Sequence, residues 1–471
     1  MKKVIFTILL ALSFAGPALS VTFNADTIYS RWLLNSRLNN FHNKGNTRGF
    51  TFTSPYGVSQ ATVDSWDYVP GLVCKAAYCA IDAYIGNPSW EVNHTPFYNC
   101  VIGWTDDMAE SSHISSSNQS NIDDKNAAKI FCEAYALTND DKYKTAVLPF
   151  IQSLEGTSLP HSKIESPNTG AGGFWHKPSY QNQMWLDGQY MGPALWAEYL
   201  GKCSPATNNT ASWASIALQF DIIYEQLYDS EKKLFYHAFA SESADNNKVS
   251  AWLADGTRHS KEYWGRGTGW LFAALVDVLE FMPSGIDIKN GQDCKTRLTN
   301  YLNTVAEGLK LRQDDSGCWT QLLQYPEGYV PEGGSKANYL EASCSFMFTY
   351  AYLKGMRLGL LSKATYEATA IKAFKGCVAT FLTTGSNGEL NVRQSCESAG
   401  LDGSRLGTAL YYLNDGDGGS DTKINNNSEG KALGPAIMAS AEYERAYYVK
   451  SASPSPSPSS CNCLKATSVD K

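Results

Sequence analysis

The sequence predicts an all-α protein in which helical hairpins pack side by side and close into a ring. From about Val63 onward, apolar residues recur at spacings of three and four in one segment after another, whereas strand signals are few. Clusters rich in glycine, proline, asparagine and serine separate these segments, for example at residues 166–173 and 414–419. Because a closed ring of hairpins gathers its loops at one mouth, this fold class also predicts a cleft at that mouth.

The first predicted hairpin pairs residues 125–137 with residues 142–154. Two Asp-Asp pairs, at 123–124 and 140–141, stand where these helices begin, and aspartate is typical of the first turn of a helix. The later predicted helices follow with short connections, at residues 184–200, 212–227, 267–281, 294–311, 339–361, 363–382 and 432–448. The chain is therefore expected to consist mostly of paired helices.

The N-terminus has the pattern of a secretory signal peptide. Three residues, Met1-Lys2-Lys3, precede an apolar run at 4–14 and a small-residue exit that ends at Ser20. The run is shorter than the roughly 20 residues needed to cross a bilayer, so a membrane anchor is disfavoured. We expect a leader at 1–20, one barrel domain at 21–450, a Ser/Pro linker with a short cysteine-containing tail at 451–471, and a secreted protein without membrane contact.

The charge and the cysteine content limit the partners, the disulfides and the metal sites that the chain is expected to have. The net charge of -7, without a basic stripe, argues against a nucleic-acid partner. The 12 cysteines predict several disulfides in an exported chain, with Cys74–Cys79 and Cys461–Cys463 among many conceivable pairs, and their spacing matches no zinc site. The acidic loop 415–421 lacks the pattern of an EF-hand and is interpreted as a flexible loop. No metal and no cofactor are expected.

Two aspartates are candidates for acid and base chemistry. Asp187 follows Trp185 at a helix start, in a segment that also carries His176 and Lys177, so it combines a carboxylate with cations and large rings. The alternative is that Asp187 only complements the helix dipole. Asp123 also stands at a helix start, where an N-cap role would explain it without catalysis.

A glycine-rich segment at 263–270 places Arg266 between Trp264 and Trp270. Glycine allows close approach of the backbone to a ligand, and arginine pairs with carboxylates while tryptophan offers a stacking face. This combination suits an acidic sugar, although a buried tryptophan pair with a structural arginine would look the same. His237 lies in an aromatic run and on its own is typical of a core histidine.

Taken in order, these motifs resemble the unsaturated rhamnogalacturonyl hydrolases of glycoside hydrolase family 105, which are related to the unsaturated glucuronyl hydrolases of family 88. The resemblance covers most of the chain after the leader, and its segments are Ile122-Asp123-Asp124, 173–177, 184–187, Tyr236-His237, 264–270, 317–321, 339–343 and 434–438. It implies an (α/α)6 barrel of six helical hairpins. It also implies a substrate with a 4,5-unsaturated uronic acid at its non-reducing end, left by a lyase acting on pectin. The oligomeric state is not evident from the sequence, and a monomer is favoured.

By this resemblance, Asp187 is the catalytic acid and Asp123 the second carboxylate. The family hydrates the enol ether: Asp187 protonates C4, its carboxylate then activates water that adds at C5, and the hemiketal opens. The reaction requires a proton on Asp187, so a raised pKa is expected from burial and from a nearby second carboxylate. His237 and Arg266 are implied to anchor the sugar, Trp264, Trp270 and Trp185 to line its pocket, and His176 with Lys177 to lie beside it.

Three alternatives stay open from the sequence. The enzyme could be an unsaturated glucuronyl hydrolase acting on fragments of ulvan or glycosaminoglycan, or an ordinary inverting hydrolase, because the fold and the acids would look alike. A carbohydrate-binding protein that has lost catalysis is the third, and the presence of both Asp123 and Asp187 argues against it.

Overall fold

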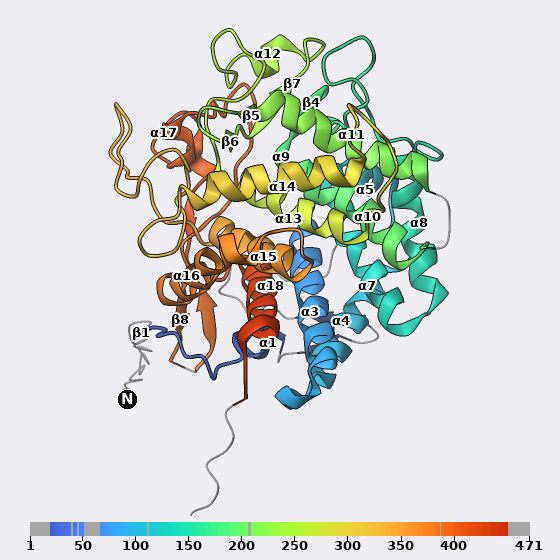
Figure 1. The fold of residues 1–471 in the computed structure, drawn as a ribbon, viewed down its shortest axis with the longest axis vertical. Helices are drawn as coiled ribbons and strands as arrows, with labels where there is room; N and C mark the ends of the chain where they lie inside the picture. Colours follow the sequence, from blue (N-terminus) through green and yellow to red (C-terminus); the bar gives the residue numbers. More distant parts are fainter. Residues whose placement is uncertain are drawn as a thin grey trace, which may run out of the picture.

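The computed structural model describes residues 19–38, 41–44, 47–50, 66–110, 113–205, 209–386 and 388–450. Most of the predicted leader and all of the predicted tail, with Cys461 and Cys463, lie outside these residues. Within them, the chain forms helical hairpins arranged as a ring (Figure 1).

Each hairpin places one helix inside the ring and one outside. The inner helices of the described chain are α3 (Tyr68–Gly86), α7 (Lys129–Thr138), α10 (Pro193–Lys202), α13 (Gly265–Phe281), α15 (Ala342–Arg357) and α18 (Gly430–Tyr447). Their outer partners, in the same order, are α4 (Thr95–Met108), α8 (Asp141–Glu155), α11 (Thr210–Leu227), α14 (Cys294–Lys310), α16 (Lys363–Phe381) and α1 (Tyr29–Leu38). The (α/α)6 barrel predicted above is confirmed.

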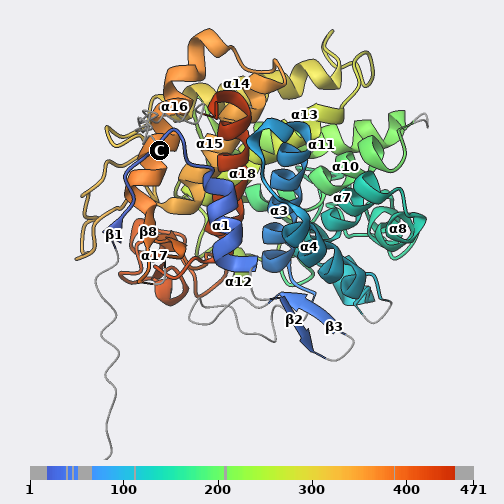
Figure 2. The same ribbon diagram turned by 90° about the horizontal axis from the view of Figure 1, so that it is seen from below.

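Helix α18 closes the ring. It packs against α15 on one side and α3 on the other, and its outer partner α1 comes from the beginning of the described chain (Figure 2). Inner helices are buried almost all round, as in α13 and α15, whereas outer helices such as α14 bury one stripe. The core therefore lies between the two layers and inside the ring.

Shorter elements connect the hairpins. The helical ones are η1 (Pro88–Trp90), α5 (Ser116–Ser120), α6 (Ile122–Lys125), η2 (Asn126–Ala128), α9 (Leu186–Met191), α12 (Asn246–Val249), α17 (Ala409–Tyr412) and η3 (Gly419–Asp421). The strands are β1 (Leu19–Ser20), β2 (Phe41–Lys44), β3 (Thr47–Phe50), β4 (Gln183–Trp185), β5 (Tyr228–Asp229), β6 (Leu234–Phe235), β7 (Ala238–Ala240), β8 (Leu382–Thr384), β9 (Leu390–Val392), β10 (Ser395–Cys396) and β11 (Ile424–Asn425). They pair antiparallel, in the order β1-β8-β9 and as the two-stranded sheets β2-β3, β4-β7, β5-β6 and β10-β11.

The expected disulfides are absent from the described part of the chain, where the cysteines are free thiols. Cys74 and Cys79 lie five residues apart on α3, which separates them by about 140° around a helix axis and points the side chains apart. Burial raises the pKa of Cys100 to about 12, as expected for a thiol that serves as a small apolar core residue. Cys74–Cys79, one of the many conceivable pairs, is therefore not a disulfide.

Paired charges link neighbouring inner helices inside the ring, in the half of the barrel away from their N-terminal ends. Lys75 on α3 contacts Glu198 at 2.6 Å, and Lys354 on α15 contacts Asp277 at 2.6 Å. Arg357 contacts Glu442 at 2.7 Å. Because a buried charge is costly unless it is paired, these contacts tie the inner helices together in the half of the barrel opposite the cavity described below.

Glu444 on α18 joins the last inner helix to the first outer one. Its carboxyl accepts hydrogen bonds from both the backbone amide of Ser30, at 2.9 Å, and the Ser30 hydroxyl. Burial raises the pKa of Glu444 to about 8. Between its ordinary pKa and this value, the folded protein holds one more proton than the unfolded chain, so stability falls as the pH rises through this window.

We therefore expect Glu444→Gln to remove a pH dependence of stability. Urea unfolding of the wild type and the variant should show a difference in unfolding free energy that changes between pH 5 and pH 8, at about 1.4 kcal/mol per pH unit for one proton. The wild type should lose stability relative to the variant as the pH rises. Parallel pH profiles for the two proteins would show that Glu444 does not titrate in this range.

Candidate active site

A polar cavity of about 120 Å³ opens at the N-terminal ends of the inner helices. Its lining includes both predicted acids and the predicted cations and rings, namely Asp123, His176, Lys177, Trp185, Asp187, Trp264, Arg266 and Trp270. Tyr68, Tyr180, Met191, Arg405, Lys431 and the segment Ser398, Ala399 and Gly400 complete the lining. Because α3, α13, α15 and α18 begin around this cavity, their dipoles favour an anionic ligand there.

The pairing of β4 with β7 brings Asp187 to His237. Strand β4 runs directly into α9, whose first turn carries Asp187, and its partner β7 begins one residue after His237. The backbone amide of Leu186 donates to the His237 carbonyl at 3.0 Å, which fixes this register. His237 Nε2 then lies 3.2 Å from Asp187 Oδ2, although 50 residues separate the two in the sequence.

His237 is more than a core histidine, because both ring nitrogens are engaged. Its Nδ1 lies 2.7 Å from the hydroxyl of Tyr412 on α17, and its ring packs 4.7 Å from that of Trp264. When Asp187 is ionised, the tautomer with a proton on Nε2 satisfies both contacts: Nε2–H donates to Asp187 and Nδ1 accepts from Tyr412.

The predicted rise in the pKa of Asp187 is wrong for the unliganded protein. Burial does raise the pKa of Asp187, but the hydrogen bond from His237 and the electrostatic interaction with this histidine outweigh it, and the pKa lies below its ordinary value. The sequence did not reveal that the histidine would contact the acid directly. Asp187 is therefore a carboxylate in the free protein, and it stays ionised until a change in its surroundings raises its pKa.

The second acid, Asp123, is not the cap of its helix. The N-cap of α6 is Asn121, whose side chain accepts from the Asp123 amide at 3.1 Å. This leaves the Asp123 carboxylate to contact Lys177 Nζ at 2.6 Å and His176 Nε2 at 3.5 Å. The His176 carbonyl accepts from the amide of Ile122, which joins the 173–177 motif to the start of α6.

His176 is neutral and forms one layer of a ring stack. Burial lowers the pKa of His176 to about 4. Its ring lies 4.4 Å from that of Trp185, and the ring of Tyr180 lies 4.7 Å from Trp185 and 6.0 Å from His176. The three rings therefore form one cluster, and its third member, Tyr180, was not singled out from the sequence.

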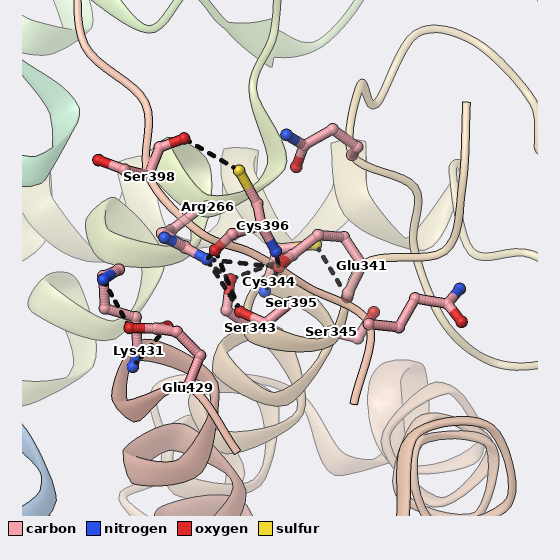
Figure 3. Close-up of polar contacts among 12 residues, drawn as sticks. Arg266, Glu341, Ser343, Cys344, Ser345, Ser395, Cys396, Ser398, Glu429 and Lys431 are labelled. Atoms are coloured by element: carbon pink, nitrogen blue, oxygen red, sulfur yellow. Dashed lines mark hydrogen bonds and ion pairs between the residues drawn. The ribbon is translucent and has the colours of Figure 1, made fainter. Parts of the chain in front are cut away.

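Arg266 is fully buried in a network of contacts within the protein (Figure 3). Its Nε donates to Ser343 at 2.8 Å, and its Nη2 donates to Ser395 at 3.1 Å and to the carbonyl of Cys396. The same Nη2 lies 3.5 Å from Glu341, the N-cap of α15. Arg266 was expected either to pair with a sugar carboxylate or to be structural, and two of its nitrogens are structural: Nε binds the start of α15 and Nη2 binds β10.

The tryptophans of the glycine-rich segment lie at the base of the cavity. Trp264 donates from Nε1 to Gln321 at 3.2 Å, and Trp270 packs 4.9 Å from Tyr190. Gly267 allows this packing, because a Cβ there would lie 3.3 Å from His237 and 3.4 Å from Trp264. These rings therefore shape the cavity wall around His237.

No group of three or more His, Cys, Asp or Glu side chains that could hold a metal ion occurs among the residues described. The carboxylates of loop 415–421 are bonded within the protein, as Asp415 accepts from the amide of Lys336 at 2.7 Å and Asp417 from the hydroxyl of Thr408 at 2.6 Å. None of the described helices is long and apolar enough to span a membrane.

A helical barrel with paired acids, cations and aromatic rings at one mouth is the architecture of a carbohydrate-processing enzyme. The model of Glycosyl Hydrolase Family 88 matches residues 50–447, and a solved glycoside hydrolase of family 105 from C. acetobutylicum is 30% identical with a TM-score of 0.66, covering 81% of this chain and 94% of that one. The chain therefore belongs to glycoside hydrolase family 105, within the broader family 88 group, and is a glycosidase.

More distant relatives agree with this assignment. A protein from Formosa agariphila named unsaturated 3S-rhamnoglycuronyl hydrolase is 27% identical over 231 residues, which span 49% of this chain and 55% of that protein. The unsaturated glucuronyl hydrolase of Bacillus sp. GL1 shares the fold with a TM-score of 0.56 at 12% identity, covering 90% of this chain and 96% of that one.

Proposed function

We propose that the enzyme releases a 4,5-unsaturated uronic acid from the non-reducing end of lyase-generated oligosaccharides, with rhamnogalacturonan fragments of pectin as substrates. The observation that carries this proposal is the contact between Asp187 and His237 at the base of a small, cation-rich cavity. A cavity of about 120 Å³ suits a single terminal sugar, and its cations suit a carboxylate.

The chemistry follows from the residues around Asp187. The acid protonates C4 of the enol ether, positive charge develops at C5, and the resulting carboxylate takes a proton from the water that adds at C5. The hemiketal opens, and the remaining sugars leave as an alcohol. His237 donates to Asp187 in its ionised state, which stabilises the form that activates water.

Substrate binding favours the protonated form of Asp187, which takes up a proton from solvent. The uronate carboxylate adds a negative charge and displaces water, and both changes raise the pKa of a neighbouring acid. We place this carboxylate near Arg266, whose Nη1 is directed away from the network that holds the other two nitrogens (Figure 3). Asp123, paired with Lys177, then faces the sugar from the other side of the cavity.

This account predicts different pH profiles for the two kinetic constants. The profile of kcat/KM reports the free enzyme, in which the pKa of Asp187 is low, so kcat/KM should decline with rising pH from an acidic value. The profile of kcat reports the complex, so its decline should begin at a higher pH. Steady-state rates across a pH series measure both, and a decline of kcat at the same pH or lower would contradict the proposed effect of the substrate.

The finer choice of substrate is tested with a panel of lyase products. Unsaturated galacturonate linked to rhamnose is compared with unsaturated glucuronate linked to sulfated rhamnose and to an amino sugar, and the ultraviolet absorbance of the double bond is followed. The rhamnogalacturonan product should give the highest kcat/KM. A preference for sulfated rhamnose would favour the activity in the name of the Formosa agariphila relative.

The predicted leader at 1–20 further supports action outside the cell, where long pectin chains are first cleaved. Detection of a processed N-terminus in secreted protein would test this part of the proposal.

A further inference from the structure

The cavity changes character from its base to its mouth. Residues at the base, such as Met191, Trp264 and Arg266, are almost completely buried. Tyr180 and Arg405 are partly exposed, and they come from two loops that are 225 residues apart in the sequence. Both side chains therefore lie where a substrate whose terminal sugar is beside Asp187 would leave the cavity.

Arg405 is held more loosely than the other cations of the cavity. Lys177 and Lys431 each lie 2.6 Å from a carboxylate, and Arg266 is fixed by several hydrogen bonds. The Nε of Arg405 lies 3.4 Å from Asp421 and 3.7 Å from Asp402, and its side chain is 37% exposed. Ion pairs of this kind contribute little, so the guanidinium can turn to another anion.

The backbone beneath Arg405 keeps the guanidinium at the cavity wall. A Cβ at Gly400 would lie only 2.4 Å from Arg405 Nη1, so the guanidinium rests directly on the main chain of a lining residue. The Gly400 amide donates to the Tyr411 hydroxyl at 2.6 Å. The preceding strand, β10, is bound to Arg266, and Ser398 lies beside the hydrogen bonds that Arg266 makes (Figure 3).

Tyr180 supplies an apolar surface to the same mouth. Its ring packs 4.7 Å from that of Trp185 and 6.0 Å from that of His176, and these two contacts hold its plane in place. An aromatic ring of this kind offers a large rigid contact face at low conformational cost. The mouth therefore combines one stacking surface with one loosely paired guanidinium.

We infer that Tyr180 and Arg405 form a subsite for the sugar next to the unsaturated residue, and that Arg405 selects oligosaccharides carrying an anionic group, a carboxylate or a sulfate ester, on that leaving portion. Arginine binds both groups through paired hydrogen bonds. This inference rests on the proposed function, because it assumes that the unsaturated sugar lies at Asp187. Arg405 has no part in the chemical step.

Kinetics with Arg405→Gln test the inference. The substrates are unsaturated galacturonate linked to rhamnose alone, to rhamnose followed by galacturonate, and to sulfated rhamnose. For at least one anionic substrate, KM should rise about tenfold with kcat nearly unchanged, as expected for loss of one charge-assisted hydrogen bond, while the neutral substrate is unaffected. The substrate whose KM rises shows whether Arg405 binds the carboxylate or the sulfate.

Two further variants distinguish a contact between Arg405 and the substrate from a general effect of losing one positive charge. Arg405→Lys should restore part of the affinity for the anionic substrate. Lys423→Gln removes the same charge from an exposed position outside the cavity and should leave every KM unchanged. Equal effects of Arg405→Gln on neutral and anionic substrates, or no effect on any of them, would overturn the inference.

Binding measurements keep this test separate from the proposed function. Calorimetry with Asp187→Asn, alone and combined with Arg405→Gln, reports affinity without turnover, and the anionic substrate should lose about tenfold in the double variant. If wild-type protein turned over none of the substrates, the proposed function would fail, whereas the calorimetric comparison would still decide the role of Arg405.

Discussion

Replacement of Asp187 by asparagine should reduce kcat by at least about 10⁴-fold. The side chain serves as acid toward C4 and then as base toward water, and each role typically contributes about 10²- to 10⁴-fold. Asparagine retains the oxygen that accepts from His237 Nε2, so the local structure should persist. Single-turnover rates on an unsaturated substrate measure the loss, and calorimetry shows that binding remains.

The matched control is Asp229→Asn. Asp229 lies on β5 and accepts from the hydroxyls of Tyr263 and Tyr236, but it lines no part of the cavity. This variant should keep its activity to within a few-fold. If Asp187→Asn were no more impaired than Asp229→Asn, the assignment of Asp187 as the acid would be untenable.

Replacement of Glu341 by alanine should destabilise the protein by about 3–5 kcal/mol, because it leaves the buried charge of Arg266 without its partner. Glu341 is completely buried. Its carboxylate also accepts from Ser343 at 2.7 Å and from the amides of Cys344 and Cys396, both at 2.8 Å. The substitution therefore removes a helix cap and the anchor of β10 together.

Urea unfolding measures this loss, with Glu307→Ala as the control. Glu307 pairs with Lys233 on the surface and its side chain is 57% exposed, so its removal should change the unfolding free energy by less than about 1 kcal/mol. Similar small changes for both variants would show that the Arg266–Glu341 pair is dispensable. Because Arg266 supports the cavity, the folded Glu341 variant should also have an increased KM.

Most of the fold could be predicted because it depends on local patterns. The predicted helices 212–227, 294–311 and 363–382 match α11, α14 and α16 to within two residues. Residues 184–200 were expected to form one helix but divide into β4, α9 and α10, since Trp185 is extended and the chain bends at Gly192, ahead of Pro193.

Only those residues of the site that belong to recognisable sequence motifs could be predicted. Asp123, Asp187 and His237 stand in recognisable segments, and the structure places both acids in the lining of one cavity and the buried His237 in contact with Asp187. Arg405 lies on a loop and Tyr412 on the short helix α17 that follows it, in a segment with no periodic pattern, and only the closed ring brings this segment to the cavity and to His237. The low pKa of Asp187 depends on a contact across 50 residues, which composition and spacing do not reveal.

The most direct test of the mechanism is to run the reaction in heavy-oxygen water and analyse the released sugar by mass spectrometry while following the ultraviolet absorbance of the double bond. Hydration of the enol ether predicts loss of that absorbance in step with sugar release, with the heavy oxygen initially on C5. Release of a sugar that keeps its double bond and carries the heavy oxygen on C1 would contradict the account, and would indicate ordinary hydrolysis at the anomeric carbon.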